Sequence, residues 1–206
     1  VPELSSTGQI KQKFVDQRAP MPAGHTLELG ETRRFGDLKV TPVRITREAL
    51  EFTHFSDPKK TRPPGETVWK LWLRFENVSD DIAFMPLGKE IVFNRYKRPG
   101  DKYREVANNF IGPLAKKASN GPMVKVYPHV VQDVWDLKGQ DIEHVLKPGE
   151  SFETYIPSDA EGLAALSGEM VWRVHFRKGV NAKSRRGVTT LMEVVFDSSE
   201  VQNRKG

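Results

Sequence analysis

The sequence contains no cysteine among its 206 residues. Structural disulfides, thiol-based catalysis and cysteine-ligated zinc are therefore excluded. A chain without thiols suits a cytosolic protein and an exported bacterial protein equally, so the absence does not decide the compartment. No run of about 18 apolar residues occurs either, and the sequence predicts no membrane-spanning helix.

Histidines are few and are spaced unlike metal ligands. The five are His25, His54, His129, His144 and His175. No two of them stand two or four positions apart, the spacings that place two imidazoles on one metal ion. Four acidic residues gather between residues 133 and 143, but they lack the order of a calcium-binding loop. We therefore expect a solvated loop there, and no metal or cofactor.

Catalytic motifs are also missing. The chain has no G-x-S-x-G nucleophile elbow, and Ser167 and Ser184 fit turns better. Paired carboxylates of the glycoside-hydrolase kind meet only in space, so a sequence does not reveal them. The sequence thus predicts a protein that is not an enzyme. The alternative is a hydrolase whose site is assembled by folding.

Charge is nearly balanced, with 32 basic and 27 acidic residues and a net charge of +5. This balance predicts weak attraction to anionic polymers or membrane surfaces, and no specific nucleic-acid binding. Hydrophobic residues make up 37% of the chain, below the roughly 45–50% of typical domains. We expect a modest core with long polar connections.

The strongest pattern lies at residues 67–77, TVWKLWLRFEN, where apolar residues alternate. One face of an extended chain would carry Trp69, Leu71, Leu73 and Phe75, because successive side chains point to opposite sides. The opposite face would carry Trp72 between two cations. The sequence predicts a central core strand here, with Trp72 either in a second core layer or stacking on a sugar.

Further short strands are predicted along the chain, at residues 26–29, 32–35, 38–45, 49–55, 82–86, 90–96, 124–134, 151–156, 170–177 and 188–196. Pro42 implies an edge position or a bulge. Residues 45–49 are short enough to link two strands as a hairpin, and the glycine-bounded loop 178–187 predicts another. Residues 159–167 are the one convincing helical stretch, with Asp159 as its N-cap.

Many short strands, turns every 8–12 residues and a single helix predict an all-β antiparallel β-sandwich. We expect a linker or N-terminal arm at residues 1–25, one sandwich domain at 26–197 and a polar tail at 198–206. An insertion is expected at about residues 97–123. Because the chain begins at Val1 and not with Met, we also expect an upstream signal or anchor segment.

Two motifs carry a resemblance to a known family. The first is F-x-N-x-S at Phe75, Asn77 and Ser79, and the second is L-x-P-G-E at residues 146–150, ahead of the strand at 170–176. In this order they resemble immunoglobulin-like extracytoplasmic domains of unknown function from bacteria, over residues 32–196. The chain lacks that fold's Cys–Trp–Cys core.

The resemblance implies an immunoglobulin-like fold and a periplasmic or membrane-anchored location, with membrane attachment only through a segment upstream of residue 1. It also implies a non-catalytic binding module for a protein or cell-envelope polymer, and it transfers no catalytic residues. Asn77 also starts an N-x-S glycosylation pattern, which in a bacterial chain would be a turn.

One loop concentrates positive charge, between the last two predicted strands. Its basic side chains, with no acid among them, are Arg177, Lys178, Lys183, Arg185 and Arg186. This concentration predicts a binding site for an anion, and so a polyanion- or glycan-binding module as an alternative function. The competing interpretation is that these cations provide solubility and block edge pairing. Two further basic loops lie at residues 59–62 and 97–104.

Overall fold

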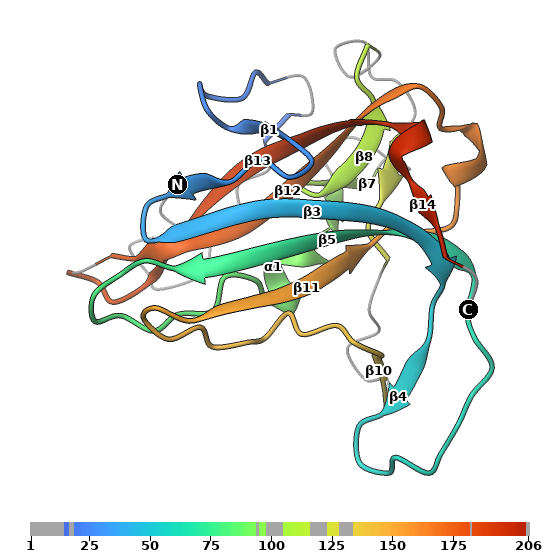
Figure 1. Ribbon diagram of the computed structural model, residues 1–206, viewed down its shortest axis with the longest axis horizontal. Helices are drawn as coiled ribbons and strands as arrows, with labels where there is room; N and C mark the ends of the chain where they lie inside the picture. Colours follow the sequence, from blue (N-terminus) through green and yellow to red (C-terminus); the bar gives the residue numbers. More distant parts are fainter. Residues whose placement is uncertain are drawn as a thin grey trace.

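The computed structural model describes residues 15–16, 19–93, 95–97, 105–115, 123–127, 134–181 and 183–204. Within these ranges the protein is mainly β, with two five-stranded sheets, two two-stranded sheets and one four-residue α-helix (Figure 1). No helix in this part of the chain is long and apolar enough to cross a bilayer.

The first five-stranded sheet contains the long C-terminal hairpin. Its order is β1 (Thr26–Glu28), β13 (Gly187–Asp197), β12 (Glu169–Val180), β8 (Phe110–Pro113) and β9 (Val124–Lys125). Strands β12 and β13 pair antiparallel, which confirms the predicted hairpin, whereas β1 runs parallel to β13. Strand β8 lies inside the predicted insertion, so part of that segment belongs to the core sheet.

The second sheet is built on the stretch that alternates most strongly in the sequence. Its order is β11 (Ser151–Pro157), β5 (Thr67–Asn77), β3 (Leu38–Ala49) and β14 (Gln202–Asn203), with β2 (Arg33–Phe35) also pairing with β3. Strand β5 has neighbours on both sides, which confirms its prediction as a central strand.

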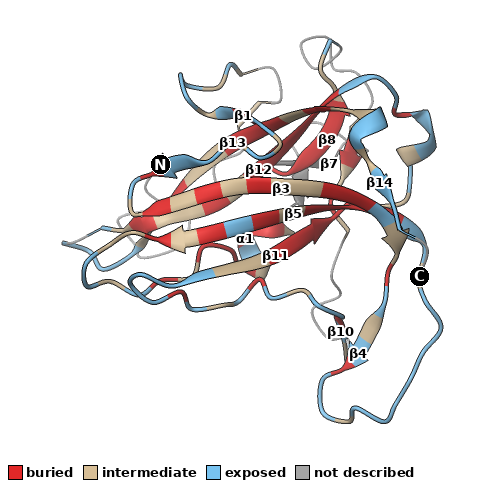
Figure 2. Ribbon diagram, in the orientation of Figure 1, coloured by how far each residue is buried: buried red, intermediate tan, exposed pale blue. Residues whose placement is uncertain are grey.

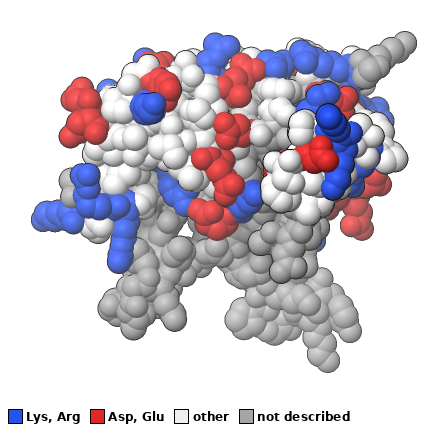
Figure 3. Space-filling view, turned by 90° about the horizontal axis from the view of Figure 1, so that it is seen from below, with Lys and Arg blue, Asp and Glu red and all other residues white. Residues whose placement is uncertain are grey.

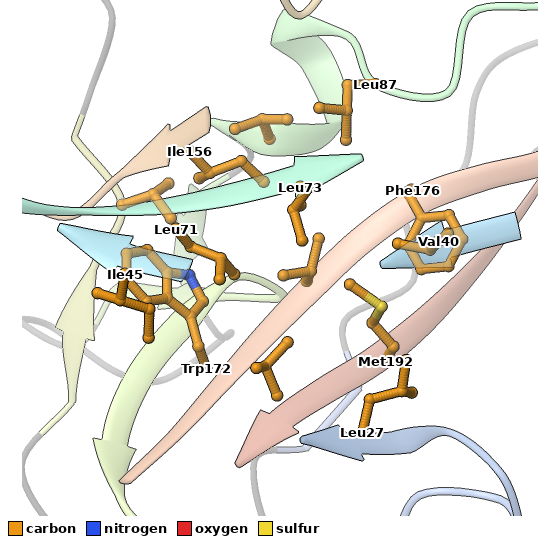
Figure 4. Close-up of a cluster of buried hydrophobic side chains, with 14 of the residues drawn as sticks. Leu27, Val40, Ile45, Leu71, Leu73, Leu87, Ile156, Trp172, Phe176 and Met192 are labelled. Atoms are coloured by element: carbon orange, nitrogen blue, oxygen red, sulfur yellow. The ribbon is translucent and has the colours of Figure 1, made fainter. Parts of the chain in front are cut away.

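Side chains from both sheets form one buried cluster. Leu71 and Leu73 of β5 lie beside Trp172 and Phe176 of β12 (Figure 4). Figure 2 shows buried residues along the facing lengths of β3, β5, β12 and β13. Removing one such side chain from water stabilises the fold by about 1.5–3 kcal/mol.

Two small sheets complete the fold: β4 (Phe52–His54) with β10 (Trp135–Leu137), and β6 (Arg95–Lys97) with β7 (Glu105–Ala107). The β4–β10 pair projects from the body at the lower right of Figure 1. At its base Leu137 packs with Leu50, Val68 and Tyr155 in a second buried cluster.

The predicted hairpin at residues 45–49 is wrong, because β3 continues unbroken to Ala49. Its residues stay paired with β5, from Ile45 opposite Leu71 to Ala49 opposite Thr67. The register of this pairing shifts between Pro42 and Arg44. The bulge expected at Pro42 is therefore confirmed.

The predicted helix at residues 159–167 is also wrong. Only a 3₁₀ turn forms, η2 (Leu163–Ala165), after Gly162 in a left-handed conformation with φ 85°. The helix α1 (Lys89–Val92) lies instead where a strand was predicted at 90–96. Ile91 and Val92 are both buried; a strand would point these neighbours to opposite sides, whereas a helical turn buries both.

Other predictions are met in part. Residues 82–86 form only an isolated bridge, Phe84 with Leu146. The short 3₁₀ turn η3 (Ser198–Glu200) and β14 lie in the predicted polar tail. Residues 1–14 of the arm and residues 98–104 and 116–122 of the insertion lie outside the described residues, as do residues 128–133 of the predicted strand.

Candidate functional site

A buried ion pair dominates the outer face of the first sheet. Arg173 is 0% and Glu193 3% exposed, and Arg173 Nε and Nη2 donate to Glu193 Oε1 over 2.9 and 2.7 Å. The guanidinium also donates to three carbonyl oxygens of the N-terminal arm, those of Val15 (3.5 Å), Asp16 (2.9 Å) and Ala19 (3.3 Å). Arg173 therefore docks this part of the arm onto the sheet.

The neighbouring polar side chains are also engaged in structural contacts. Asn109, 0% exposed, donates from Nδ2 to the carbonyls of Ile91 (2.9 Å) and Val92 (3.1 Å). Its Oδ1 accepts the His175 amide over 2.7 Å. Burial, together with the Arg177 cation, lowers the pKa of His175 to about 4. Asn109 therefore joins helix α1 to β12, whereas the buried Nδ1 of the His175 ring has no hydrogen-bond partner among the described residues.

The five cations of the predicted anion site divide into two groups. Arg177 pairs with Glu90 and donates from Nη1 to the carbonyl of Leu87 over 3.1 Å, so its charge is already engaged. Lys178 is partly buried near the end of β12, and its carbonyl accepts the Asp37 amide over 2.9 Å. Of these two residues, Arg177 has its charge engaged by an ion pair, whereas Lys178 makes its contact through the backbone.

The remaining three cations, Lys183, Arg185 and Arg186, are exposed on one turn. Asn181 Oδ1 holds this turn by accepting the amides of Lys183 (3.1 Å) and Ser184 (2.9 Å). Arg185 has φ 56°, a left-handed conformation that is uncommon for a residue other than glycine. In Figure 3 basic side chains gather at the left end, where the β12–β13 turn lies in Figure 1.

The two basic loops that the structure describes lie far apart. The β12–β13 turn lies beside Asp37, near the Asn77 end of β5. The loop with Lys59 and Lys60 follows β4 beyond the opposite end of β5 (Figure 1). An 11-residue strand separates the two loops, which is roughly 30 Å. In the third loop, Arg98, Lys102 and Arg104 lie outside the described residues, as does the side chain of Lys97.

Trp72 belongs to a second core layer, as one of the two sequence interpretations predicts. Arg44 lies over its ring at 4.4 Å and Tyr155 tilts against it at 4.9 Å. Its Nε1 donates to Thr46 Oγ1 over 3.0 Å. Beside it Lys70 is 4% exposed, and burial lowers the pKa of its ammonium group.

Asn77 joins the two motifs that carry the family resemblance. Its Nδ2 donates to the carbonyls of Ile82 (2.8 Å) and Leu146 (2.9 Å), and its Oδ1 accepts the amide and the hydroxyl of Ser79. The side chain is 0% exposed. A glycan has no access to this amide, so the turn interpretation is the correct one.

The most exposed large apolar side chain among the described residues is Phe55, at 67%. It follows β4, and its amide donates to the carbonyl of Val134, itself 44% exposed, over 3.0 Å. The His54 ring stacks on Phe55 at 5.5 Å and meets Trp135 edge-on at 5.0 Å. The phenyl ring is thus held in place while it faces solvent.

We call residues 52–66 and 134–137 the projecting tip. Its loop is ordered by His54, whose Nδ1 accepts the amides of Ser56 (3.3 Å) and Asp57 (3.1 Å). The Arg62 guanidinium lies over the Phe52 ring at 3.7 Å. Lys59 and Lys60 are exposed beyond it. The tip therefore combines a fixed apolar group with outward positive charge.

The sequence pattern did not reveal this surface. Residues 49–55 are predicted as an ordinary strand, and the loop that follows is predicted only as a second basic loop. The available signal was the two-residue period, which places Phe55 on the same face as the polar Thr53. An aromatic residue on the polar face beside a proline-rich basic loop is the pattern that marks such a tip.

Among the described residues, no group of three or more His, Asp or Glu side chains is placed to hold a metal ion. No family model and no curated protein matches this chain. A solved structure, the yjhA protein from Bacillus subtilis, is similar in fold at 12% identity and a TM-score of 0.41. The match covers 82% of this chain and 99% of that one.

Proposed function

We propose that this protein is a non-catalytic binding module that acts outside the cytoplasm and engages a protein or cell-envelope partner through its projecting tip. The observation that carries the proposal is Phe55, 67% exposed yet stacked on His54. Aromatic side chains, phenylalanine among them, are enriched in protein interfaces relative to the rest of the surface. Ordering the ring before binding also lowers the entropy cost of association.

The placement of the reactive side chains supports a non-catalytic role. Arg173, Glu193 and Asn77 are buried and bonded within the fold. Lys70 is enclosed between Glu48 and the Tyr155 ring. These groups act by holding segments of the chain together, and a substrate would have to displace those segments to reach them.

We further propose an immunoglobulin-like sandwich for the two five-stranded sheets and an extracytoplasmic, periplasmic or membrane-anchored location. The shared cluster that includes Trp69 and Trp172 supports two facing sheets. The bond between Asn77 and Leu146 supports the family resemblance, because it joins the F-x-N-x-S strand to the L-x-P-G-E turn.

Site-specific photocrosslinking tests the function. A photoreactive phenylalanine replaces Phe55 in one variant and Val145 in another, and each is irradiated with native cell envelopes. Val145 is a matched control, because it is 53% exposed but precedes Leu146 at the other end of β5. We expect discrete adducts from position 55 alone. Equal adducts from both positions, or none, would contradict the proposal.

A second candidate function is polyanion binding by Lys183, Arg185 and Arg186, favoured by their exposure on a single held turn. Replacing all three with alanine should abolish retention on heparin at low salt. The control replaces Arg33, Lys39 and Lys138, which are paired with Glu31, Glu76 and Glu51. It removes the same charge elsewhere, and retention should persist. Equal loss in both variants would indicate net charge alone.

A further inference from the structure

We infer that the projecting tip binds anionic lipid bilayers, with Phe55 entering the headgroup region and Lys59 and Lys60 contacting the lipid phosphates. This inference rests on the proposed function and names the partner class of the same surface. The elements are Phe55 and Val134, both exposed, and two exposed lysines a few residues away. Aromatic and basic side chains together are the pair that membrane interfaces favour.

The size of the apolar patch favours a bilayer over a folded protein partner. A stable protein interface buries about 800 Å² on each side, whereas one aromatic ring buries about 150–250 Å². The tip offers one phenyl ring and one valine. A lipid surface needs no larger patch, because it adapts to the shape of the inserted group and adds attraction for the neighbouring cations.

Positive charge is confined to the outer loop of the tip, because the tip as a whole is balanced and its acids Glu66 and Asp136 lie beside Leu50 and Thr53, on the body side of Phe55. Residues 55–64 hold Lys59, Lys60 and Arg62 against one acid, Asp57, whose Oδ1 accepts the Lys59 amide over 3.0 Å. Among the nearby acids, Glu51 is paired with Lys138, while Glu66 and Asp136 are exposed. Figure 3 views the molecule from the side of this projection, and both basic and acidic side chains border uncharged atoms in its right half.

Several backbone positions of this loop have no free hydrogen-bond donor. Pro58, Pro63 and Pro64 lie within it and are exposed. Proline has no backbone N–H, so these positions bring no donor that would lose water on contact with lipid. The His54 Nδ1 bonds to the Ser56 and Asp57 amides satisfy two more donors. The backbone donors that directly follow Phe55 are therefore already paired before any contact with lipid.

Sedimentation with lipid vesicles measures how much the tip contributes to lipid binding. The full chain is sedimented with phosphatidylcholine vesicles that contain 0 or 30% phosphatidylglycerol, at 0.1 M salt. Each basic side chain near an anionic surface strengthens binding by about fivefold. We expect Lys59→Gln with Lys60→Gln to weaken binding to the anionic vesicles by about 25-fold, and Phe55→Ser by at least tenfold. Binding should fall at 1 M salt.

Two control variants separate the tip from general charge and apolar surface. Arg34→Gln with Lys147→Gln removes the same charge from exposed positions outside the tip and outside the β12–β13 turn, and Val145→Ser removes an exposed apolar group. Both should bind the vesicles as the unchanged protein does. If either control weakens binding as much as its tip counterpart, the lipid inference is overturned.

A dye attached next to Phe55 measures whether the tip enters the bilayer. Because the chain has no cysteine, Ser56→Cys carries an environment-sensitive dye beside Phe55, and Val145→Cys carries the same dye as control. Anionic vesicles should shift the emission of the dye to the blue at position 56 only. No vesicle binding, or no shift at position 56, overturns lipid binding. If lipid binding fails but position 55 still forms photoadducts with a protein, the proposed function stands without the lipid inference. If position 55 forms no photoadducts either, the lipid inference and the proposed function are both wrong.

Discussion

Arg173 and Glu193 lie directly opposite each other on β12 and β13, and their buried side chains meet at 2.7 Å. Arg173 donates hydrogen bonds both to Glu193 and to the carbonyl oxygens of Val15, Asp16 and Ala19 in the arm. One side chain thus joins a cross-strand ion pair to a segment more than 150 positions earlier in the chain. This geometry leads to two predictions.

Glu193→Ala should destabilise the protein by about 3–5 kcal/mol, because it leaves a buried guanidinium without its carboxylate. Urea denaturation followed by intrinsic fluorescence measures this loss. The double variant Arg173→Met with Glu193→Leu should lose clearly less, since it buries no uncompensated charge. A double variant less stable than Glu193→Ala would show that the charge is not the cause.

Arg173→Lys should release the N-terminal arm while keeping the positive charge. An ammonium group has three donors and lacks the planar fork of a guanidinium, so the carbonyls of Val15, Asp16 and Ala19 lose partners. Amide hydrogen exchange at Val15, whose N–H donates to Asn108 Oδ1 over 2.9 Å, should accelerate at least tenfold. Exchange in the centre of β5 is the internal control. Unchanged protection at Val15 would contradict the docking role.

Asn77→Ala should cost about 2–4 kcal/mol of stability. The substitution removes the two bonds to the carbonyls of Ile82 and Leu146 and the two bonds from Ser79, and each buried hydrogen bond contributes about 0.5–1.5 kcal/mol. Thermal unfolding measures the loss. Ser79→Ala removes only contacts to Asn77 Oδ1 and the Ile82 carbonyl, so its effect should be smaller. Equal losses of stability in the two variants would show that the Ser79 bonds, and not the bonds from Asn77 to Ile82 and Leu146, account for the effect.

Stability should fall as the pH drops from about 6.5 to about 4. Burial first, and the Arg177 cation second, lower the pKa of His175 from 6.5 to about 4. Between these values the unfolded chain binds the proton and the folded chain does not, so protonation favours unfolding. The loss from this group should reach about 2–3 kcal/mol by pH 4.

Urea denaturation across this pH range checks the prediction for His175. His175→Gln should remove that part of the slope. His144→Gln, which alters a histidine paired with Asp141 at 3.0 Å, should leave the His175 contribution in place. A slope that His175→Gln does not reduce would assign the pH dependence to other groups.

Local patterns predicted β5 and the β12–β13 hairpin well, because each has long alternation and clear turns at its ends. They failed at residues 45–49, where a polar turn-like sequence stays extended because β5 offers it hydrogen-bond partners along its whole length. They also failed at residues 159–167, where the left-handed Gly162 precedes only a single 3₁₀ turn. The parallel pairings of β1 and β14 join distant segments, and no local signal marks them.

Some features of the candidate sites were likewise visible in the sequence, and others were not. The basic loop was visible because charge concentration is a property of consecutive residues, and Lys183, Arg185 and Arg186 do lie exposed on one turn. The engagement of Arg177 was not visible, because its partner Glu90 is 87 positions away. The exposure of Phe55 depends on where the β4–β10 pair stands relative to the body, which only the packed fold decides.

By itself, the sequence determined the β-rich class, the facing apolar stripes and the absence of thiol chemistry, since composition and two-residue alternation are local properties. The tertiary structure decided which polar groups are hydrogen-bonded inside the fold and which apolar side chain stays exposed to solvent. Burial and pairing arise from contacts between residues far apart in the chain. Those contacts bury Arg173 and Asn77 within the fold and leave Phe55 exposed on the tip.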